Sequence, residues 1–516
     1  MACPFRYICA ATIVFLLCVT GSAGAQAAGG QTQGGGAQAA QVPLSGRGMP
    51  GGSVTATQTP APGPSTGINT LNATVSAQGP FIGSLSNQGA QPFGGTLSLR
   101  DAVQRGLSYN LSAVSMSAVL NQAHGQQTVA RGALLPTING EVTGTRQQTN
   151  LGALGVRFES PIPGFSFPTI VGPFNNIDLR ARLSQTVLDL TALNNYRAAG
   201  ATLRADQLMV EDTRDLIVLA VGGAYLQAVT AGVRAASAQA QLDTANALFR
   251  QNTERRQVGL VAQVDVARSQ VQALTQQQRL ISLQNEFAKQ KINLARMIGL
   301  PPTDQYSLSD IIPFEAAPTL SIEDALDQAR MTRGDLKAAA AHIEAAERAL
   351  AAARAQRLPV AQVSADVGAI GPTPGDARRT FSVVGTVRVP LWAGRIGGQI
   401  QQAEAAVTQR RAEMDDLTSQ LQGDVHKTFL DLQALTAQVE VADQSRQVAQ
   451  QALDLTRQRF DAGVSDSLEV IQAQEALANA ELDYINSVYA HNIAKLTLAR
   501  SVGQAAERLP AFLKLP

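Results

Sequence analysis

The second half of the chain repeats the first, and this duplication limits the folds that it can adopt. Residues 97–103 (LSLRDAV) align with residues 320–326 (LSIEDAL), an offset of 223. Further along, residues 258–260 (VGL) align with residues 462–464 (AGV), an offset of 204. A repeat of this size indicates two copies of one architecture.

Each copy is expected to contain the same elements in the same order. A helix comes first, then two short alternating segments, a very long helix, a turn that contains glycine, and a last helix. At 1.5 Å per residue, the longest helices would be on the order of 100 Å long. Only 4% of the residues are aromatic, and the helices are rich in Ala and Gln, which suits the wall of a hollow tube better than a solid bundle. The helices are expected at 97–134, 190–256, 264–298, 321–357, 393–458 and 468–502.

Four short segments alternate between polar and apolar residues. In one of them, Phe381 and Val383 fall on one face and Ser382 and Arg388 on the other. A period of two over about 9–11 residues is typical of strands that separate lipid from water. The alternative is a half-buried strand of a soluble domain, which has the same local pattern. The four segments are 137–146, 177–184, 360–367 and 377–389.

Four strands are too few for a closed barrel in one chain. Bacterial outer-membrane barrels start at about eight strands, and open strand edges are not tolerated in lipid. The strands must therefore be shared among identical chains in a cyclic oligomer. Two copies would supply eight strands and three copies would supply twelve.

The N-terminus has the pattern of a secretory signal peptide. Arg6 precedes an apolar run, and Ala23-Gly24-Ala25 gives a small-residue cleavage site. The alternative is an uncleaved anchor, but the run is shorter than the roughly 20 residues of a membrane span. No later segment approaches 18 uninterrupted apolar residues, so no membrane-spanning helix is predicted. The chain's cysteines all lie in the signal segment, which excludes disulfides and thiolate sites from the mature chain: Cys3, Cys9 and Cys18.

The segment after the signal peptide is of low complexity. Arg47 is its only charged residue, and it is rich in Gly, Ala, Gln and Pro. Such a segment buries too little apolar area to offset the entropy of ordering, so disorder is predicted. The expected organisation is a signal peptide (1–25), this extension (26–95), a first repeat (96–300), a linker (301–319), a second repeat (320–503) and a C-terminal tail (504–516).

Charge and motifs exclude several classes of protein. The chain has 41 Lys and Arg against 40 Asp and Glu, without the basic excess of a nucleic-acid-binding protein. It contains no nucleophile-elbow, zinc-protease or phosphate-binding motif. We therefore expect no enzyme activity and no cofactor. Four histidines are scattered over helices without ligand spacing, so no metal site is predicted: His124, His342, His426 and His491.

The helix ends and turns resemble those of the TolC-like outer membrane efflux protein family, over residues 97–503. The motifs are VGLVAQVDV (258–266), FDAGV (460–464) and VPLWAGR (389–395). The resemblance implies a mainly α fold with a membrane β-barrel part, as a homotrimer with twelve strands in the outer membrane. A helical tunnel would extend into the periplasm. The trimer would be a passive exit duct for efflux or type I secretion, with a periplasmic adaptor and an inner-membrane RND or ABC pump as partners.

By the same resemblance, the periplasmic end of the tunnel is a gate. Phe460 takes the place of a family tyrosine, and Ser465 stands where some members carry an arginine. The polar lock of those members is therefore expected to be weaker here. We expect three Glu469 carboxylates to form a ring that attracts cations, the alternative being a solvated helix residue. The expected gate residues are Asp265, Phe460, Glu469 and Gln472.

The two turns between helices would be tips that dock on the adaptor. Gly259 and Gly463 permit tight turns, and Leu260 and Val464 would leave apolar side chains exposed. The alternative is that these side chains pack on their neighbours. The expected tip residues are Val258, Gly259, Leu260, Ala462, Gly463 and Val464.

Polar strand residues are expected to line the barrel lumen, since a charge in contact with lipid at mid-membrane costs about 2–4 kcal/mol. The competing class of protein is a periplasmic adaptor, or a structural coiled-coil envelope protein, without a pore. An adaptor would carry one helical hairpin between β-rich halves, not two copies that each contain strands. The expected lumen residues are Asp178, Arg180, Arg182 and Arg388.

Overall fold

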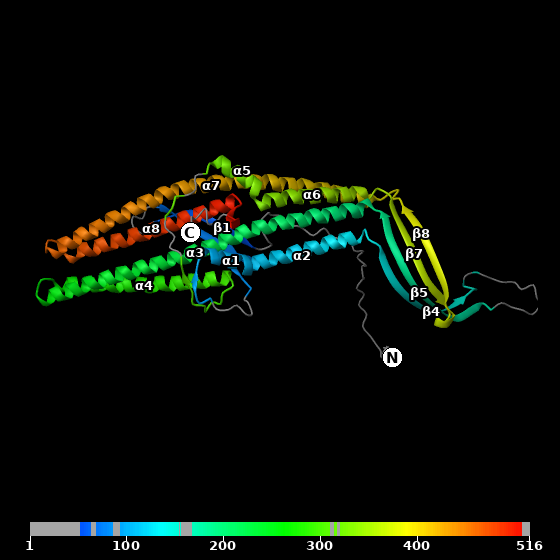
Figure 1. Cartoon of the computed structure of the whole chain (residues 1–516), viewed down its shortest axis with the longest axis horizontal. Coiled ribbons are helices and arrows are strands. Elements are labelled where there is room, and N and C mark those ends of the chain that lie inside the picture. The colour runs from blue at the N-terminus through cyan, green and yellow to red at the C-terminus, as the bar shows by residue number, and fades with distance from the viewer. Residues whose placement is uncertain are drawn as a thin grey trace, which may run out of the picture. The chain divides into compact units, whose positions relative to one another are not determined.

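A computed structural model describes most of the chain (Figure 1). The expected signal peptide and most of the expected C-terminal tail lie outside the described residues. The described residues are 52–62, 69–85, 93–153, 155, 168–309, 314–316 and 320–507.

Four strands form one antiparallel sheet, in the order β4-β5-β7-β8 (Figure 1). Each lies where the alternation of the sequence predicted a strand, although β4, β5 and β7 extend beyond the predicted ends. Because β4 and β8 each pair on one side only, they are the edges of the sheet. The bounds are β4 (Thr137–Asn150), β5 (Ile170–Leu188), β7 (Val360–Gly371) and β8 (Arg378–Arg388).

The sheet has an apolar face and a polar face. Leu179 pairs with Val142 on one side and Ala369 on the other, and Val367 pairs with Phe381. These side chains share one face, and much of it is exposed: 73% of Val142 and 82% of Phe381. The intervening residues form the polar face. A sheet with an exposed apolar face needs an apolar environment or a partner.

Eight α-helices are described, and the long ones form two tiers (Figure 1). Next to the sheet, α3 packs against α2 and α6, and α7 packs against α6. Farther away, α3 packs against α4 and α8, and α7 packs against α8. Equivalent helices of the two halves have equal lengths: α3 and α7 have 68 residues each, and α4 and α8 have 35. The bounds are α2 (Leu111–Gly132), α3 (Leu190–Gln257), α4 (Gln263–Met297), α6 (Gly334–Ala355), α7 (Gly394–Asp461) and α8 (Ser467–Ser501).

The first helix of each copy was predicted to be continuous, and this is wrong. Each is two helices, broken at Asn110 in the first copy and at Arg333 in the second. The amide of Asn110 is buried, and its Nδ2 donates to the carbonyls of Phe81 at 2.9 Å and Met297 at 3.2 Å. Its Oδ1 accepts from the backbone N–H of Ser112 at 3.0 Å, which caps the next helix. The helices before the breaks are α1 (Leu99–Tyr109) and α5 (Ile322–Thr332).

Buried charges hold the second break. Arg333 Nε donates to Asp335 Oδ1 at 3.0 Å, and Asp335 Oδ1 also accepts from the backbone N–H of Leu336 at 2.9 Å. Beside this pair, Arg500 of α8 binds Asp212 of α3 at 2.5 Å. Asn110 binds Phe81 and Met297, which are far away in the sequence, and next to Arg333 the hydroxyl of Thr332 donates to Val502 O. The helical periodicity therefore did not reveal either break.

Part of the low-complexity extension is ordered, contrary to the prediction of disorder. Strands β1 (Ser53–Pro62) and β2 (Asn69–Gln78) form an antiparallel hairpin, followed by the 3-10 turn η1 (Gly79–Ile82). Val75 fits against Gly223 of α3, where a Cβ would lie 2.8 Å from its methyl groups. Gln438 of α7 accepts from Leu71 N–H at 2.9 Å and donates to Leu71 O at 3.3 Å. The hairpin is ordered because the helices supply the apolar surface that its own composition lacks.

Four separate apolar clusters lie among the described helices, and two of them are small groups where α6 meets α7. The main cluster lies where α1, α3, α4 and α8 meet the hairpin, and Tyr225 Oη there donates to Leu97 O at 2.9 Å. Nearby, β3 (Thr96–Leu97) pairs with β6 (Ser307–Leu308) from the linker. The second cluster, here called the tip cluster, lies near the far ends of the long helices. It contains Leu248, Leu453, Phe460, Val470 and Ile471.

By length and composition, α3 could cross a membrane, whereas the sequence predicted no such helix. Residues 216–233 contain no charged side chain, although Gln227 and Thr230 interrupt the apolar run. The most apolar window has a mean hydropathy of 1.8, and 67% of it is buried inside the chain. This burial is what a core helix of a folded protein has, because α3 is central in both tiers.

Candidate functional site

The two helical hairpins, α3–α4 and α7–α8, end in matching turns at the same end of the molecule (Figure 1). Gly259 and Gly463 have φ values of +79° and +73°, which favour glycine, and each closes a turn at the helix C-terminus. Val258, Leu260 and Val464 are exposed, at 70%, 76% and 70%. Ala462 caps α7 next to Gly463. The turns therefore present apolar side chains that nothing in the described part of the chain covers.

Two of the predicted gate residues lie between the hairpins. Asp265, in the first turn of α4, accepts a hydrogen bond at 3.1 Å from Ser467 Oγ of α8. Its carboxylate also pairs with Arg268 at 3.4 Å. Phe460 is buried in the tip cluster. Both residues thus connect the two halves of the chain.

The other two predicted gate residues, Glu469 and Gln472, lie exposed on α8. Glu469 Oε2 accepts from Ser465 Oγ at 2.7 Å and lies 3.4 Å from Arg459. These contacts stay within one hairpin. Glu469 is therefore free to face another copy of the chain without breaking a link between hairpins.

Sequence reasoning missed Arg255, at the end of α3. Its guanidinium lies 4.4 Å from the ring centroid of Phe460, and it donates to Phe460 O at 3.0 Å. It also pairs with Asp461 at 3.0 Å, and Gln251 donates to the same carboxylate at 2.8 Å. The only signal in the sequence was the basic pair Arg255-Arg256 in the last helical turn, which usually indicates no more than a favourable helix-dipole contact. Polar contacts between the hairpins therefore exist, through the predicted residues Asp265 and Phe460 and through Arg255, which the resemblance did not indicate.

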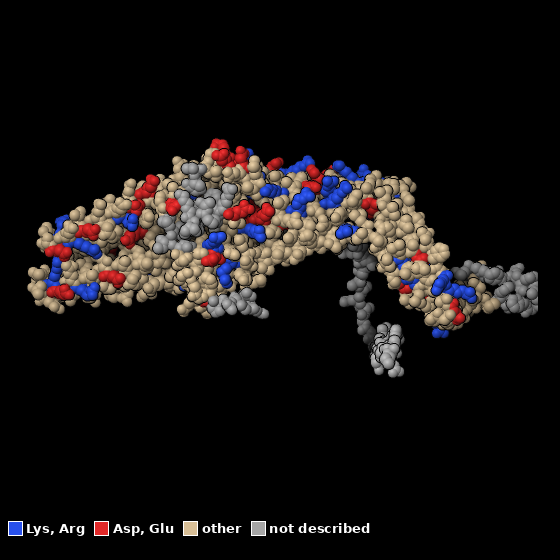
Figure 2. Space-filling model, in the orientation of Figure 1, with Lys and Arg blue, Asp and Glu red and all other residues tan. Residues whose placement is uncertain are grey.

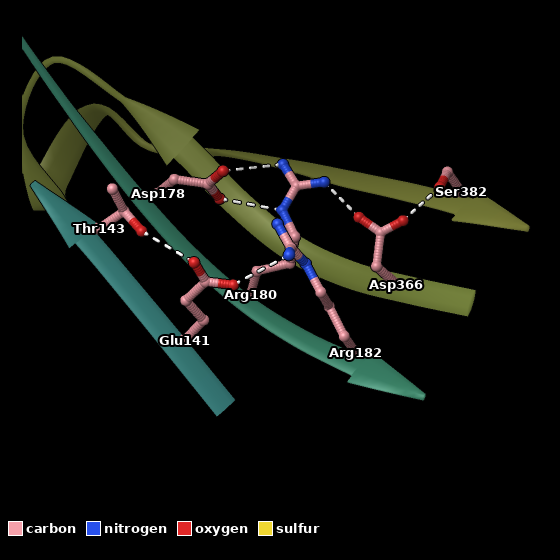
Figure 3. Close-up of polar contacts among 7 residues, drawn as sticks. All are labelled: Glu141, Thr143, Asp178, Arg180, Arg182, Asp366 and Ser382. Carbon is pink, nitrogen blue, oxygen red and sulfur yellow. Dashed lines mark hydrogen bonds and ion pairs between the residues drawn. The ribbon is translucent and has the colours of Figure 1, made fainter. Parts of the chain in front are cut away.

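Three of the four predicted lumen residues make polar contacts on the polar face of the sheet, in two separate groups (Figure 3). In the first group, Arg180 donates to Asp178 at 3.0 and 3.2 Å and also binds Asp366 of β7, which accepts from Ser382 of β8. In the second group, Arg182 pairs with Glu141 of β4 at 3.1 Å, and Thr143 donates to the same carboxylate.

The first group links β5, β7 and β8, the second links β4 and β5, and together they contain three carboxylates and two guanidiniums. The fourth predicted residue, Arg388, is exposed at the end of β8 on the same face as Ser382 but outside both groups. Figure 2 shows charged side chains over the length of the helices, near the hairpin turns and on the part of the sheet far from the helices. The strands next to the helices are largely uncharged on the face shown.

Among the described residues, no three His, Cys, Asp or Glu side chains are grouped so that they could hold a metal ion. The arrangement instead provides a two-faced sheet, long paired helices and two exposed apolar turns. These features can form a wall and a docking surface.

Comparison with known proteins agrees with this geometry. Residues 103–300 and 325–504 match the family described as "Outer membrane efflux protein". The pyoverdine export outer membrane protein OpmQ of Pseudomonas putida is 24% identical over 396 residues, which cover 73% of this chain and 79% of that protein. The toluene efflux pump outer membrane protein TtgF of Pseudomonas putida is 24% identical over 438 residues, covering 78% and 83%.

A solved structure has the same fold. The CmeC outer membrane channel of Campylobacter jejuni superimposes with a TM-score of 0.69 at 17% identity. The match covers 79% of this chain and 86% of that one.

Proposed function

The chain belongs to the outer membrane efflux protein family and is an outer-membrane efflux channel, and we propose that it serves as the passive exit duct of a tripartite export assembly. The observation that carries the proposal is the sheet, whose apolar face is exposed and whose ion pairs lie on the other face. On the apolar face, the register of the described strands places two charged residues, Arg146 and Arg379, both near the strand ends that are farther from the helices. In a barrel, the apolar face would contact lipid and the ion pairs would line the lumen.

The edges of the sheet support a cyclic oligomer. The described strands leave β4 and β8 each with one unpaired side, and lipid does not tolerate unpaired backbone groups. The two edges are antiparallel, so β8 of one copy can pair with β4 of the next. We propose a homotrimer, in which the four strands of each chain give twelve in total.

The helices have corresponding edges. In the tier of helices that lies farther from the sheet, the order is α4, α3, α8, α7. In this tier, α4 and α7 each have one side without a helix of this chain. Each carries exposed apolar residues with a seven-residue spacing, which is typical of helices that pack against another helix. We propose that α4 of one copy packs against α7 of the next. The exposed residues are Val264, Val271, Leu274 and Ile281 on α4, and Val441, Val448 and Leu455 on α7.

The turns at the ends of the hairpins would dock on the adaptor. Leu260 and Val464 are exposed apolar residues at the end of the molecule that is farther from the sheet (Figure 1). If the sheet lies in the outer membrane, these turns extend into the periplasm. An inner-membrane RND or ABC pump, joined through the adaptor, would supply the energy and choose the cargo.

Photocrosslinking in the native host tests this proposal. A photoreactive residue is placed at Leu260 and, separately, at Val464, and the crosslinked proteins are identified. Recovery of an adaptor with a proton-driven pump indicates efflux of small molecules or metals. An adaptor with an ATP-driven transporter indicates type I secretion or a related export.

The control is the same photoreactive residue at Gln420, an exposed position on α7 far from the turns. Absence of any adaptor from both turns, with the protein abundant in the outer membrane, would overturn the docking proposal. A structural envelope role would then be favoured.

A further inference from the structure

The contact between the two helical hairpins changes character between the main cluster and the tip cluster. In this interval, charged, amide and hydroxyl groups make the side-chain hydrogen bonds that join α3 to α8. The buried apolar residues of these two helices are alanines there, among them Ala235, Ala238, Ala245, Ala478 and Ala480. Ser237 Oγ donates to Glu481 at 2.5 Å, and Gln241 Nε2 donates to the same carboxylate at 3.1 Å. One turn nearer the main cluster, Arg234 Nε donates to Asn486 at 3.1 Å. The two apolar clusters are therefore separated by a polar layer.

A cavity of about 200 Å³ lies in this layer, and all four helices of the two hairpins line it. Glutamine is the commonest lining residue and comes from every helix. Glutamine side chains are neutral but rich in hydrogen-bonding groups, and the lining also contains Arg457 and Glu481. The glutamines are Gln241 of α3, Gln272 and Gln276 of α4, Gln450 of α7 and Gln474 of α8.

Several amide atoms at this cavity lack a hydrogen-bond partner within the described residues. They are Gln241 Oε1, Gln272 Nε2 and Gln276 Oε1. Gln272 and Gln276 are only 6% and 5% exposed, and they lie one helical turn apart on the same face of α4. A buried amide without a partner is costly, and native proteins satisfy such groups with ordered water. A polar cavity of this size has room for several water molecules.

We propose that this cavity is a water-binding site, and that its hydrated layer is the level at which the ends of the two hairpins part when the channel opens. Water can exchange hydrogen bonds with either hairpin, so the amides of this layer stay hydrogen-bonded when the hairpins separate. The main cluster would stay intact, whereas the tip cluster, the contacts of Arg255 and the hydrogen bonds Gln251–Asp461 and Ser467–Asp265 would have to break. The inference rests on the proposed channel function, since a protein without a pore has no gate to open.

The first test is direct observation of water. A structure of the purified protein at a resolution that shows ordered water is expected to contain water oxygens about 3 Å from Gln272 Nε2 and Gln276 Oε1. Amides that bond to each other across a collapsed, dry cavity would overturn the proposal. This test needs no substitution and so does not depend on the folding of a variant.

The second test replaces the water-binding amides with an apolar side chain of similar shape. In Gln272→Met/Gln276→Met, the layer becomes apolar and joins the two clusters. The open fraction in single-channel recordings is expected to fall about tenfold, which corresponds to about 1.4 kcal/mol. Gln277→Met is the matched control, because Gln277 is the exposed neighbour of Gln276.

Recordings of the unmodified protein separate the two possible failures. If it conducts and the double variant opens as often as the control, the hydrated layer does not determine opening and this inference is overturned. If the unmodified protein never conducts, even with the substitution Arg255→Ala, the channel function itself is overturned.

Discussion

The guanidinium of Arg255 lies over the ring of Phe460, 4.4 Å from its centroid, and so joins the end of α3 to the end of α7. The same side chain donates to Phe460 O and pairs with Asp461, each at 3.0 Å. One residue from the first half of the chain thus makes three contacts with the second half. In the proposed channel, these contacts hold the tip closed.

Removing Arg255 is therefore expected to favour the open state. Cation–π contacts contribute about 0.5–2 kcal/mol, and with the lost hydrogen bonds Arg255→Ala should raise the open fraction about tenfold in planar-bilayer recordings. Arg255→Lys keeps the charge but loses the planar stacking, so an intermediate effect is expected. The control is Arg256→Ala, at the exposed neighbouring residue. Equal open fractions in Arg255→Ala and the control would show that the contacts of Arg255 do not hold the tip closed.

Glu469 tests the proposed carboxylate ring. It is exposed on α8 and makes no contact with the other hairpin among the described residues. If three copies meet, Glu469→Gln should reduce cation selectivity, measured as the reversal potential in a KCl gradient, and should weaken block by divalent ions. Glu475→Gln, also exposed on α8, is the control. Selectivity that stays the same in Glu469→Gln would rule out the ring.

Leu260 tests the docking turn. A charge at this 76% exposed apolar residue should prevent docking while the trimer still forms, since no core contact is lost. Export is expected to fall about tenfold or more in Leu260→Asp, because a desolvated charge at an apolar contact costs several kcal/mol. Gln257→Asp adds the same charge nearby without removing an apolar side chain. Normal export in Leu260→Asp, assayed with intact trimers, would contradict the docking role.

Gly223 tests the attachment of the N-terminal hairpin. A Cβ there would lie 2.8 Å from the methyl groups of Val75, so Gly223→Ala should displace β2 and speed proteolysis within residues 53–82. In an uncrowded helix the same change stabilises by about 0.5–1 kcal/mol. Gly125→Ala in α2, where no atom lies within 4 Å of the added Cβ, is expected to show that gain. A hairpin equally protected in both variants would disprove the close fit.

His491 is expected to make the fold sensitive to acid. It is fully buried on α8, and neither ring nitrogen has a hydrogen-bond partner in the described part of the chain. Burial, assisted by the charge of Lys495, lowers the pKa of His491 to about 4. Between pH 6.5 and 4 the unfolded chain therefore binds a proton that the folded chain does not, and stability falls as the pH falls through this window.

Through His491, the free energy of unfolding should be about 2 kcal/mol lower at pH 5 than at pH 7.5. In His491→Phe this loss should disappear, so the drop in Tm between pH 7.5 and pH 5 becomes smaller. His426→Phe, at an exposed position on α7, should keep the full drop. Equal drops in all three proteins would show that His491 does not cause the acid sensitivity.

Much of the fold could be predicted from local patterns. The period-two alternation located all four strands of the sheet, and the repeat offset of 204 placed Gly259 and Gly463 in equivalent turns. The ends of the long helices were predicted to within a few residues. These features depend on neighbours in the sequence, and periodicity and turn chemistry report such neighbours directly.

The candidate site was predicted less completely. Asp178, Arg180 and Arg182 were identified because they alternate along one strand, but their partners Glu141 and Asp366 lie on other strands. The same limit applies to the tip: Phe460 was identified by resemblance, whereas Arg255 is 205 residues away and its local context is that of an ordinary helix end.

By itself, the sequence determined the duplicated order of elements, the two faces of each strand and the glycine turns, because each follows from the residues within a few positions. Only the tertiary structure decided that the extension forms a hairpin, that Asn110 and Arg333 break helices, and that Arg255 joins the two halves. These depend on buried amides, cations and close-fitting methyl groups that find their partners across the fold. These interactions stabilise the fold only once distant segments of the chain have come together.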